Sequence, residues 1–263
     1  MLSVFPFYFF AFIFGALVGS FLNVCIYRLP KDESVVFPPS HCPKCDYRIR
    51  FYDNIPVVSY LLLGGKCRSC KTHISLQYPA VELINGLLTL FLFIKFGITW
   101  SFLFLFLFCS ALVVITFIDL EHQIIPDVIS LPGIVIGFAA SFLLPWLGWK
   151  NSLIGILIGG GSLLIVAYGY QFLTKKEGMG GGDIKLLAMM GAFLGWRSVP
   201  FIIFVASLVG SIIGITLMVV QKKDSKLAIP FGPFLAISAI LYIFFGKEII
   251  WWYLSLAGSS PGG

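Results

Sequence analysis

The fold of this chain is decided by residues 100–119, WSFLFLFLFCSALVVITFID. No charged side chain precedes Asp119 in this stretch, and its length is near the roughly 20 residues that a helix needs to cross a bilayer. A helix is the expected form, because it satisfies its own backbone hydrogen bonds in lipid. A carboxylate entering hydrocarbon loses its hydration, so Asp119 at the end of this run indicates a functional site.

Similar apolar runs recur along the whole chain. Of its 263 residues, 59% are hydrophobic and only 11% are charged, a composition that excludes an ordinary soluble domain. The sequence therefore predicts an all-α polytopic integral membrane protein in a lipid bilayer, with about eight transmembrane helices. The predicted spans are 4–27, 78–96, 99–120, 126–147, 151–173, 183–195, 198–220 and 229–246.

The two ends of the chain differ in their predicted structure. The first run is too long for a signal-peptide core and lacks a basic leader, so we expect it to be retained as a span. An aromatic segment, Ile249 to Leu256, is expected at an interface, where Trp and Tyr prefer to lie. Residues 258–263 are expected to be a flexible tail or a cloning remnant.

Basic residues are distributed unevenly between the two sides that eight spans define. Thirteen lie on the side of the odd-numbered connections and four on the other, with Lys185 just inside a span. The positive-inside rule makes the first side cytoplasmic and puts the ends next to Asp119 and Asp183 there. This asymmetry accounts for the net charge of +6, so the charge does not indicate nucleic-acid binding. The thirteen are Arg28, Lys31, Lys44, Arg48, Arg50, Lys66, Arg68, Lys71, Lys175, Lys176, Lys222, Lys223 and Lys226.

A second acid follows a glycine-rich stretch, Glu177-Gly178-Met179-Gly180-Gly181-Gly182-Asp183, directly before the apolar run 184–194. One interpretation is that Asp183 is a helix N-cap, since Asp is favoured there. The other is catalytic: Asp119 and Asp183, at membrane edges of separate spans, face each other. Two adjacent carboxyls favour one protonated and one ionised group, as in aspartic proteases. The ionised group takes a proton from water and the neutral one hydrogen-bonds the scissile carbonyl.

Two Cys-x-x-Cys pairs lie in the only sizeable hydrophilic region, residues 29–77. Each pair offers two thiolates from one tight turn, and two pairs complete the four ligands that Zn²⁺ prefers. Disulfides or redox thiols are the alternative, and a cytoplasmic location argues against structural disulfides. Four thiolates leave no position for a catalytic water, so the zinc is expected to be structural. The predicted ligands are Cys42, Cys45, Cys67 and Cys70.

Three polar residues at membrane edges have open roles. Asn23 either joins helices by a hydrogen bond or lines a polar site, and joining is the commoner role. Glu82 is expected to cap a positive helix N-terminus, or else to contact a cationic substrate group. Asp127 has the same capping interpretation, with Pro126 helping to begin the helix.

Small residues indicate where helices approach closely. Such residues occur in the first and fifth spans, at Gly15, Gly19, Ser20, Gly155, Gly159, Gly160 and Gly161. Other motifs are missing from the sequence: the glycine-rich stretch lacks the Gly-Lys-Ser/Thr ending of a phosphate loop, and there is no His-Glu-x-x-His motif. We find no convincing Ser/His nucleophile arrangement either.

Gly180-Gly181-Gly182-Asp183 resembles the Gly-x-Gly-Asp motif of intramembrane aspartyl proteases, and the wider pattern resembles the type IV prepilin peptidases. The similar segments occur in that family's order and cover nearly the whole chain. They are Gly19-Ser20-Phe21-Leu22-Asn23-Val24, the two cysteine pairs, Tyr78-Pro79-Ala80-Val81-Glu82, Ile118-Asp119-Leu120, Ile125-Pro126-Asp127, Gly178 to Leu186 and Pro230-Phe231-Gly232-Pro233.

The resemblance implies a multi-pass enzyme of the bacterial inner membrane that cuts the basic leader from prepilins and pseudopilins after a glycine, at the cytoplasmic face. It implies catalytic roles for Asp119 and Asp183 and zinc-ligand roles for the four cysteines. It also implies that the new N-terminal residue, usually Phe, is methylated with S-adenosylmethionine, an activity for which we identify no binding residue.

The expected domains are a first transmembrane helix, 1–28, a cytoplasmic zinc-binding domain, 29–77, and a transmembrane aspartyl peptidase core, 78–257. A proton-coupled transporter is the alternative function, because buried acids also relay protons. That alternative gives no role to the cysteine module.

Overall fold

The computed structural model describes residues 5–175, 180–221 and 229–256. These residues divide into two compact units, Met1–Ile124 and Ile125–Gly263, each treated by itself below. Their secondary structure is helical, with only two isolated bridges and no strand, so the all-α prediction is confirmed. Several residues singled out in the sequence lie outside the described ranges: Lys176 to Met179, Lys222, Lys223, Lys226, Ala228 and 258–263.

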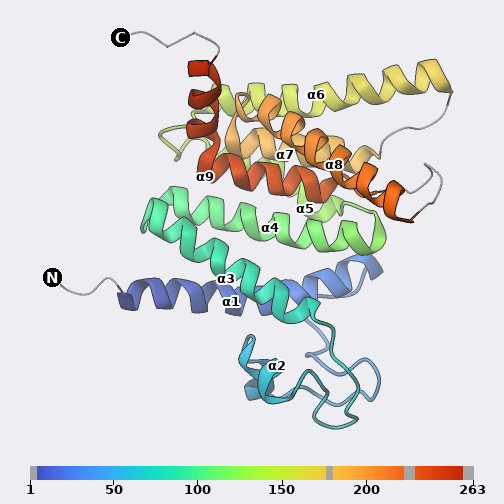
Figure 1. Cartoon of the computed structure of the whole chain (residues 1–263). Helices are drawn as coiled ribbons and strands as arrows, with labels where there is room; N and C mark the ends of the chain where they lie inside the picture. The colour runs from blue at the N-terminus through green and yellow to red at the C-terminus, as the bar shows by residue number, and fades with distance from the viewer. Residues whose placement is uncertain (1–4, 176–179, 222–228, 257–263) are drawn as a thin grey trace. The chain divides into compact units, whose positions relative to one another are not determined.

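The first unit is built on three long helices, α1 (Phe5–Arg28), α3 (Gln77–Phe96) and α4 (Trp100–His122) (Figure 1). Helix α1 packs along α3, and glycines set how closely the two approach. A methyl group added at Gly15 would overlap the side chain of Thr89, and one at Gly19 would lie 2.8 Å from the Cα of Glu82. The predicted close packing at these glycines is confirmed.

Buried amides join α1 to α3. The Asn23 Nδ2 donates to the carbonyl of Tyr78 at 3.0 Å, and the Asn85 Nδ2 donates to the carbonyl of Gly15 at 2.7 Å. The Ser110 hydroxyl of α4 donates to the Asn85 Oδ1 at 3.0 Å. The joining role predicted for Asn23 is therefore confirmed, and the same kind of bond extends to α4.

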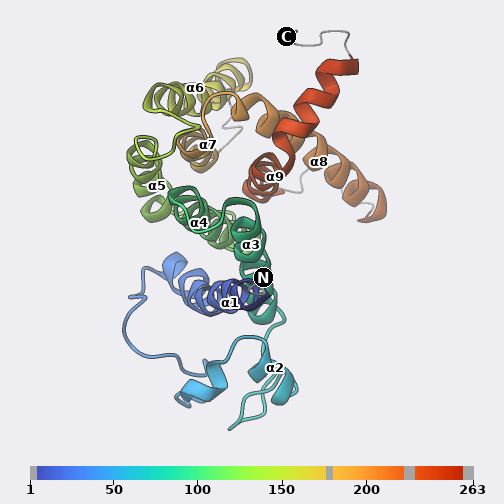
Figure 2. The same ribbon diagram turned by 90° about the vertical axis from the view of Figure 1, so that its left-hand side faces the viewer.

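Between α1 and α3 the chain forms a small irregular region (Figure 2). It contains three short helices, η1 (Leu29–Lys31), η2 (Phe51–Asn54) and α2 (Val58–Leu62), joined by turns. This is the hydrophilic segment of the sequence. Its most buried side chains include two thiols and a hydroxyl, those of Cys42, Cys67 and Ser59, so it has little apolar core of its own.

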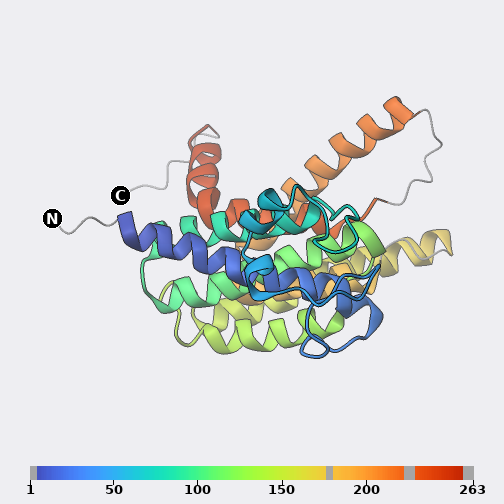
Figure 3. The same cartoon turned by 90° about the horizontal axis from the view of Figure 1, so that it is seen from below.

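The second unit is organised around α7 (Gly181–Leu194). Residues 186–194 are all buried, because α7 contacts each of the other helices of the unit. These helices are α5 (Asp127–Ala140), α6 (Trp149–Thr174), α8 (Ser198–Gln221) and α9 (Gly232–Leu256). In Figure 3 the C-terminal part of α8, in orange, extends away from α7. An all-round buried apolar helix of this kind is a core helix.

Helices α6 and α7 are packed backbone to backbone. A methyl group at Gly155 would overlap the carbonyl of Gly191, and one at Gly191 would overlap the carbonyl of Gly155. Gly159 likewise faces the carbonyl of Leu187, so most of the predicted glycine face of α6 is confirmed. Gly161 is the exception, since a Cβ there would meet no atom within 4 Å.

Six of the described helices are long and apolar enough to cross a membrane, namely α1, α3, α4, α6, α8 and α9. Two shorter ones, α5 and α7, occupy the remaining predicted segments with 14 residues each. At 1.5 Å per residue such a helix is about 21 Å long, less than the roughly 30 Å of a hydrocarbon core. These features, with large apolar side chains such as Phe172 exposed on the outside, are those of a multi-pass membrane protein.

Two predicted spans differ from the structure. The span 126–147 is wrong in its second half, because α5 ends at Ala140 and residues 141–148 form turns around Pro145 and Gly148, whose φ is +69°. The aromatic segment 249–256 is not separate from the last span. It continues α9, whose final turns stand at an angle to its first part (Figure 1).

Candidate functional site

The four cysteines of the hydrophilic region come together. Their sulfurs all lie within 4.8 Å of one another, with Cys42 and Cys70 at 3.9 Å and Cys45 and Cys67 at 4.0 Å. Four sulfurs bound to one Zn²⁺ at about 2.3 Å would lie about 3.8 Å apart in a tetrahedron. The cluster therefore fits a tetrahedral metal ion, and the predicted gathering of these ligands is confirmed.

Two similar turns present the cysteines. In the first, the Cys42 N–H donates to the Tyr47 carbonyl and Asp46 adopts a left-handed φ of +53°. In the second, the Cys67 N–H donates to the Thr72 carbonyl and Lys71 has a φ of +58°. Each turn closes tightly after a Cys-x-x-Cys pair, so both thiols of a pair point to the same side. The repeat in the sequence is thus a repeat in local structure.

Electrostatics also favour a cation in the cluster. The N–H and then the hydroxyl of Thr72 donate to Cys70 and lower its pKa to about 6. The N–H of Tyr47 lowers the pKa of Cys45, but removal from water and the neighbouring thiols outweigh it and raise that pKa to about 11. A divalent ion between these sulfurs would stabilise the thiolate forms of Cys45 and Cys70.

An ion pair braces the loop beside the cluster. The Arg68 guanidinium, inside the second cysteine pair, donates to both carboxylate oxygens of Asp53, with the shortest bond at 2.6 Å. These bonds lower the pKa of Asp53 below its ordinary value. The side chain of Asp53 is only 6% exposed, so this bidentate pair fixes η2 against the second turn.

Asp119 lies in the last turn of α4, in the first unit, and is 5% exposed. The helix ends three residues later, at His122, and the next residue, Gln123, adopts a left-handed φ of +55° and donates its N–H to the Asp119 carbonyl. The predicted position at the end of this span is confirmed. Because a left-handed C-cap stops the helix here, the acid is held at the end of the apolar run.

Asp183 belongs to the second unit and is the third residue of α7. The N-cap is Gly180, so the N-cap interpretation of Asp183 is wrong, although an acid in the first turn still suits the helix dipole. Gly182 brings this turn against the chain before α5, since a Cβ there would lie 2.9 Å from the Cβ of Ile125. At Gly181, none of the described residues places an atom within 4 Å of an added Cβ.

An ion pair that the sequence did not reveal lies next to Asp183. The Lys185 ammonium donates to both carboxylate oxygens of Asp127, at 2.7 and 2.8 Å. Asp127 is in the first turn of α5, as expected for an acid, but Pro126 is the N-cap rather than the first helical residue. A lysine just inside a span was the available signal, because a charge there needs a partner.

Glu82 does not cap its own helix. It lies in the second turn of α3, and its Oε2 accepts the N–H of Val57 at 2.7 Å. Val57 is the residue before α2 and has a φ of +61°, which is strained for a β-branched side chain. The prediction that Glu82 caps its own helix is therefore wrong. Its carboxylate caps the start of the short α2 instead, through Val57, which lies 25 residues earlier in the chain.

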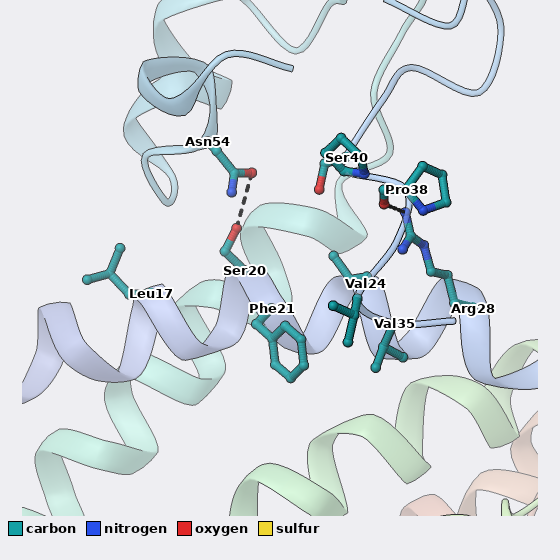
Figure 4. A pocket seen from close by; sticks show the side chains of 11 residues that line it. Leu17, Ser20, Phe21, Val24, Arg28, Val35, Pro38, Ser40 and Asn54 are labelled. Atoms are coloured by element: carbon teal, nitrogen blue, oxygen red, sulfur yellow. Dashed lines mark hydrogen bonds between the residues drawn. The ribbon is translucent and has the colours of Figure 1, made fainter. Parts of the chain in front are cut away.

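Two cavities open in the first unit between α1 and the irregular region. The larger, of about 770 Å³, extends from Asn23 and Glu82 to the cysteine turns. The smaller, of about 230 Å³, is shown in Figure 4, where the Ser20 hydroxyl approaches the Asn54 Oδ1 at 3.4 Å. Arg28 closes one end by donating to the carbonyl of Pro38 at 2.7 Å.

Comparison with known proteins covers most of the chain. Residues 13–96 match the bacterial peptidase A24 N-terminal domain, and residues 106–215 match the type IV leader peptidase family. A prepilin leader peptidase/N-methyltransferase of Pseudomonas aeruginosa is 40% identical, over 93% of this chain and 92% of its own length. Proteins of the same name from Stutzerimonas stutzeri and Neisseria gonorrhoeae are each 38% identical, over at least 93% of both chains. No solved structure matches.

Proposed function

Because the chain belongs to the type IV leader peptidase family, we propose that it removes the basic leader from type IV prepilins and pseudopilins and then methylates the new N-terminal amine. The observation that carries this proposal is the similarity over more than nine-tenths of the chain to proteins named for both activities. The enzyme is a membrane-embedded aspartic endopeptidase that cuts after a glycine, at the cytoplasmic face of the bacterial inner membrane.

Asp119 and Asp183 are the proposed catalytic carboxylates. In the mechanism, one carboxylate is ionised and takes a proton from the attacking water, while the other is protonated and hydrogen-bonds the scissile carbonyl. The proton then passes to the leaving amine, so no covalent intermediate is required. The proposal is supported by the burial of Asp119 at the end of its span and by the place of Asp183 in the first turn of a buried helix.

The glycines before Asp183 have a proposed role in substrate binding. Gly180 and Gly181 are exposed, and at Gly181 an added side chain would meet open space. Backbone without side chains lets an extended peptide approach closely, next to the carboxylate that would act on it. The scissile segment is thus proposed to lie along the start of α7.

Zinc is the metal proposed for the four-cysteine cluster. Four thiolates match the preference of Zn²⁺ and fill its coordination, so the ion stabilises the domain 29–77 and takes no part in peptide hydrolysis. A region with so little apolar core obtains much of its folding free energy from the metal. The domain lies between the first transmembrane helix, 1–28, and the peptidase core, 78–257.

The proton-coupled transporter finds no support. The family match spans both the region with Asp119 and the region with Asp183, and a transporter leaves the cysteine cluster without a role. The relatives that match most of the chain are named as peptidases and methyltransferases.

The function is tested by incubating the purified, zinc-loaded protein with a prepilin and S-adenosylmethionine and measuring the product by mass spectrometry. The expected product begins after the leader's terminal glycine and carries one added methyl group on its N-terminal residue. An intact substrate, with a protein that is folded and retains its metal, would contradict the peptidase assignment. Cleavage without the methyl group would contradict only the methyltransferase half.

A further inference from the structure

The larger cavity of the first unit has the size of a small-molecule site. Its volume of about 770 Å³ lies within the roughly 300–1,000 Å³ typical of such sites. It is lined by α1, by the cysteine region and by the start of α3, and peptide hydrolysis by Asp119 and Asp183 uses none of its lining residues. The cavity therefore offers room for a second ligand.

A buried carboxylate lines this cavity without a cation. Glu82 is only 8% exposed, and no Lys, Arg or His nitrogen lies within 4.0 Å of its carboxylate among the described residues. The N–H of Val57 satisfies one oxygen at 2.7 Å. Buried carboxylates are normally paired, because burial without a counter-charge is unfavourable. A positively charged group entering the cavity would supply the counter-charge that this carboxylate lacks.

Aromatic rings form a further part of the lining. Rings of this kind attract a cation through their faces, and they also stack on a planar base. Tyr27 already shows the first behaviour, since the ammonium of Lys31 lies 3.3 Å from its ring centroid. The cavity thus combines several π surfaces with three carboxylates, of which Glu33 is exposed and Asp53 is paired with Arg68. Among the described lining residues, Glu82 is the buried carboxylate without a cation. The tyrosines that line it are Tyr27, Tyr47, Tyr60 and Tyr78.

We propose that this cavity is the binding site of the methyl donor, with Glu82 facing the donor's positively charged sulfur. The inference rests on the proposed function, which requires S-adenosylmethionine, a ligand that joins an adenine to a sulfonium cation and supplies a methyl group to an amine. Both parts match the lining: a carboxylate and tyrosine faces for the cation, and further tyrosine rings for the base.

The charge of Glu82 has a specific consequence for ligand preference. After methyl transfer the sulfur of the ligand is a neutral thioether, so an ionised Glu82 attracts the donor but not the spent product. Replacing Glu82 by Gln should weaken binding of S-adenosylmethionine about tenfold or more and change binding of S-adenosylhomocysteine by less than about threefold. If Glu82→Gln acted only by disturbing the bond to Val57, it would weaken the binding of both ligands equally.

The test measures both affinities by calorimetry on the full-length, zinc-loaded protein, for wild type, Glu82→Gln and Asp32→Asn. The control Asp32→Asn removes the same charge from an exposed position of the same region that does not line the cavity, and it should leave both affinities unchanged. A tenfold selective loss in Glu82→Gln supports the site. Unchanged affinities, or an equal loss for both ligands, overturns it.

A second readout needs no variant and covers the case in which Glu82→Gln does not fold. A photoreactive analogue of the donor is crosslinked to wild type and the labelled peptides are identified. Label within residues 20–82 supports the site, and label confined to 125–256 overturns it. If wild type cleaves prepilin but binds no donor, this inference is overturned and the peptidase assignment is unaffected. If the protein binds the donor through Glu82 but cleaves no prepilin, the peptidase assignment is overturned instead.

Discussion

The ammonium of Lys185 lies 2.7 and 2.8 Å from the two carboxylate oxygens of Asp127 and ties the start of α7 to the start of α5. Asp183 is two residues before Lys185, and Gly182 packs on Ile125 just before α5. The first turn of α7 is therefore held at two points. This arrangement positions the proposed catalytic Asp183 without requiring either member of the ion pair to touch the substrate.

The ion pair predicts that its removal lowers the cleavage rate much more than the stability. In Asp127→Asn the free energy of unfolding should fall by less than about 1 kcal/mol, because the side chains of Lys185 and Asp127 are 39% and 55% exposed. The cleavage rate should fall by about tenfold, because a small misplacement of Asp183 is costly. Thermal unfolding and prepilin cleavage measure the two effects.

The charge-reversed double variant Asp127→Lys with Lys185→Asp is the control for that ion pair. It should recover part of the activity that each single reversal loses, since the pair can form again in the opposite sense. A double variant no more active than either single one, or an Asp127→Asn protein as active as wild type, would contradict the positioning role.

The contact between α6 and α7 predicts opposite effects for two glycines of one helix. Gly155→Ala should lower the free energy of unfolding by about 1–3 kcal/mol, since the new methyl overlaps the Gly191 carbonyl and the helices must separate. Gly161→Ala is the matched control, with no atom within 4 Å of the new methyl. It should be neutral or stabilising by up to about 1 kcal/mol, because Ala favours helix. Equal effects of the two substitutions would argue against this packing.

The cysteine cluster predicts loss of metal from any ligand variant. Purified wild type should contain about one zinc per chain, and Cys45→Ser should lose most of it and expose residues 29–77 to proteolysis. Cys25→Ser, which changes a thiol of α1 outside the cluster, is the control and should keep its zinc. Elemental analysis and limited proteolysis provide the readouts, and a wild type free of metal with four intact thiols would disprove the assignment.

The Asp53–Arg68 pair predicts a pH dependence of the same region. Arg68 lowers the pKa of Asp53 in the folded protein, so its contribution to stability is present above the ordinary Asp pKa and is lost as the pH falls through the lowered value. Asp53→Asn should therefore make residues 29–77 easier to proteolyse at pH 7, and the difference from wild type should disappear as the pH falls through the lowered pKa of Asp53. A difference that persists unchanged in acid would show that the pair does not act through its charge.

The sequence predicted the long helices well because each is specified locally. The span 78–96 corresponds to α3, Gln77–Phe96, and 151–173 to α6, Trp149–Thr174, since a continuous apolar run has no other stable form in lipid. Spacing also sufficed for the cysteines, because each pair is presented by a turn of a few residues. Local patterns therefore define both the spans and the cluster of four cysteines.

Helix ends and long-range contacts were not predictable in the same way. Residues 141–147 are apolar enough to extend α5, yet α5 ends at Ala140 and turns follow it. The last span was predicted to end at residue 246, yet α9 continues to Leu256. The Glu82–Val57 and Lys185–Asp127 bonds join residues 25 and 58 positions apart, and no spacing rule specifies such partners.

Asp119 and Asp183 are the two proposed catalytic carboxylates, and the first experiment measures prepilin cleavage by wild type, Asp119→Asn and Asp183→Asn. Each protein is purified and its zinc content and unfolding temperature are checked. Each substitution should lower the cleavage rate on the order of 10³-fold or more while the fold and metal are retained. A folded, zinc-containing variant of either aspartate that still cleaves at a rate close to wild type would contradict this assignment.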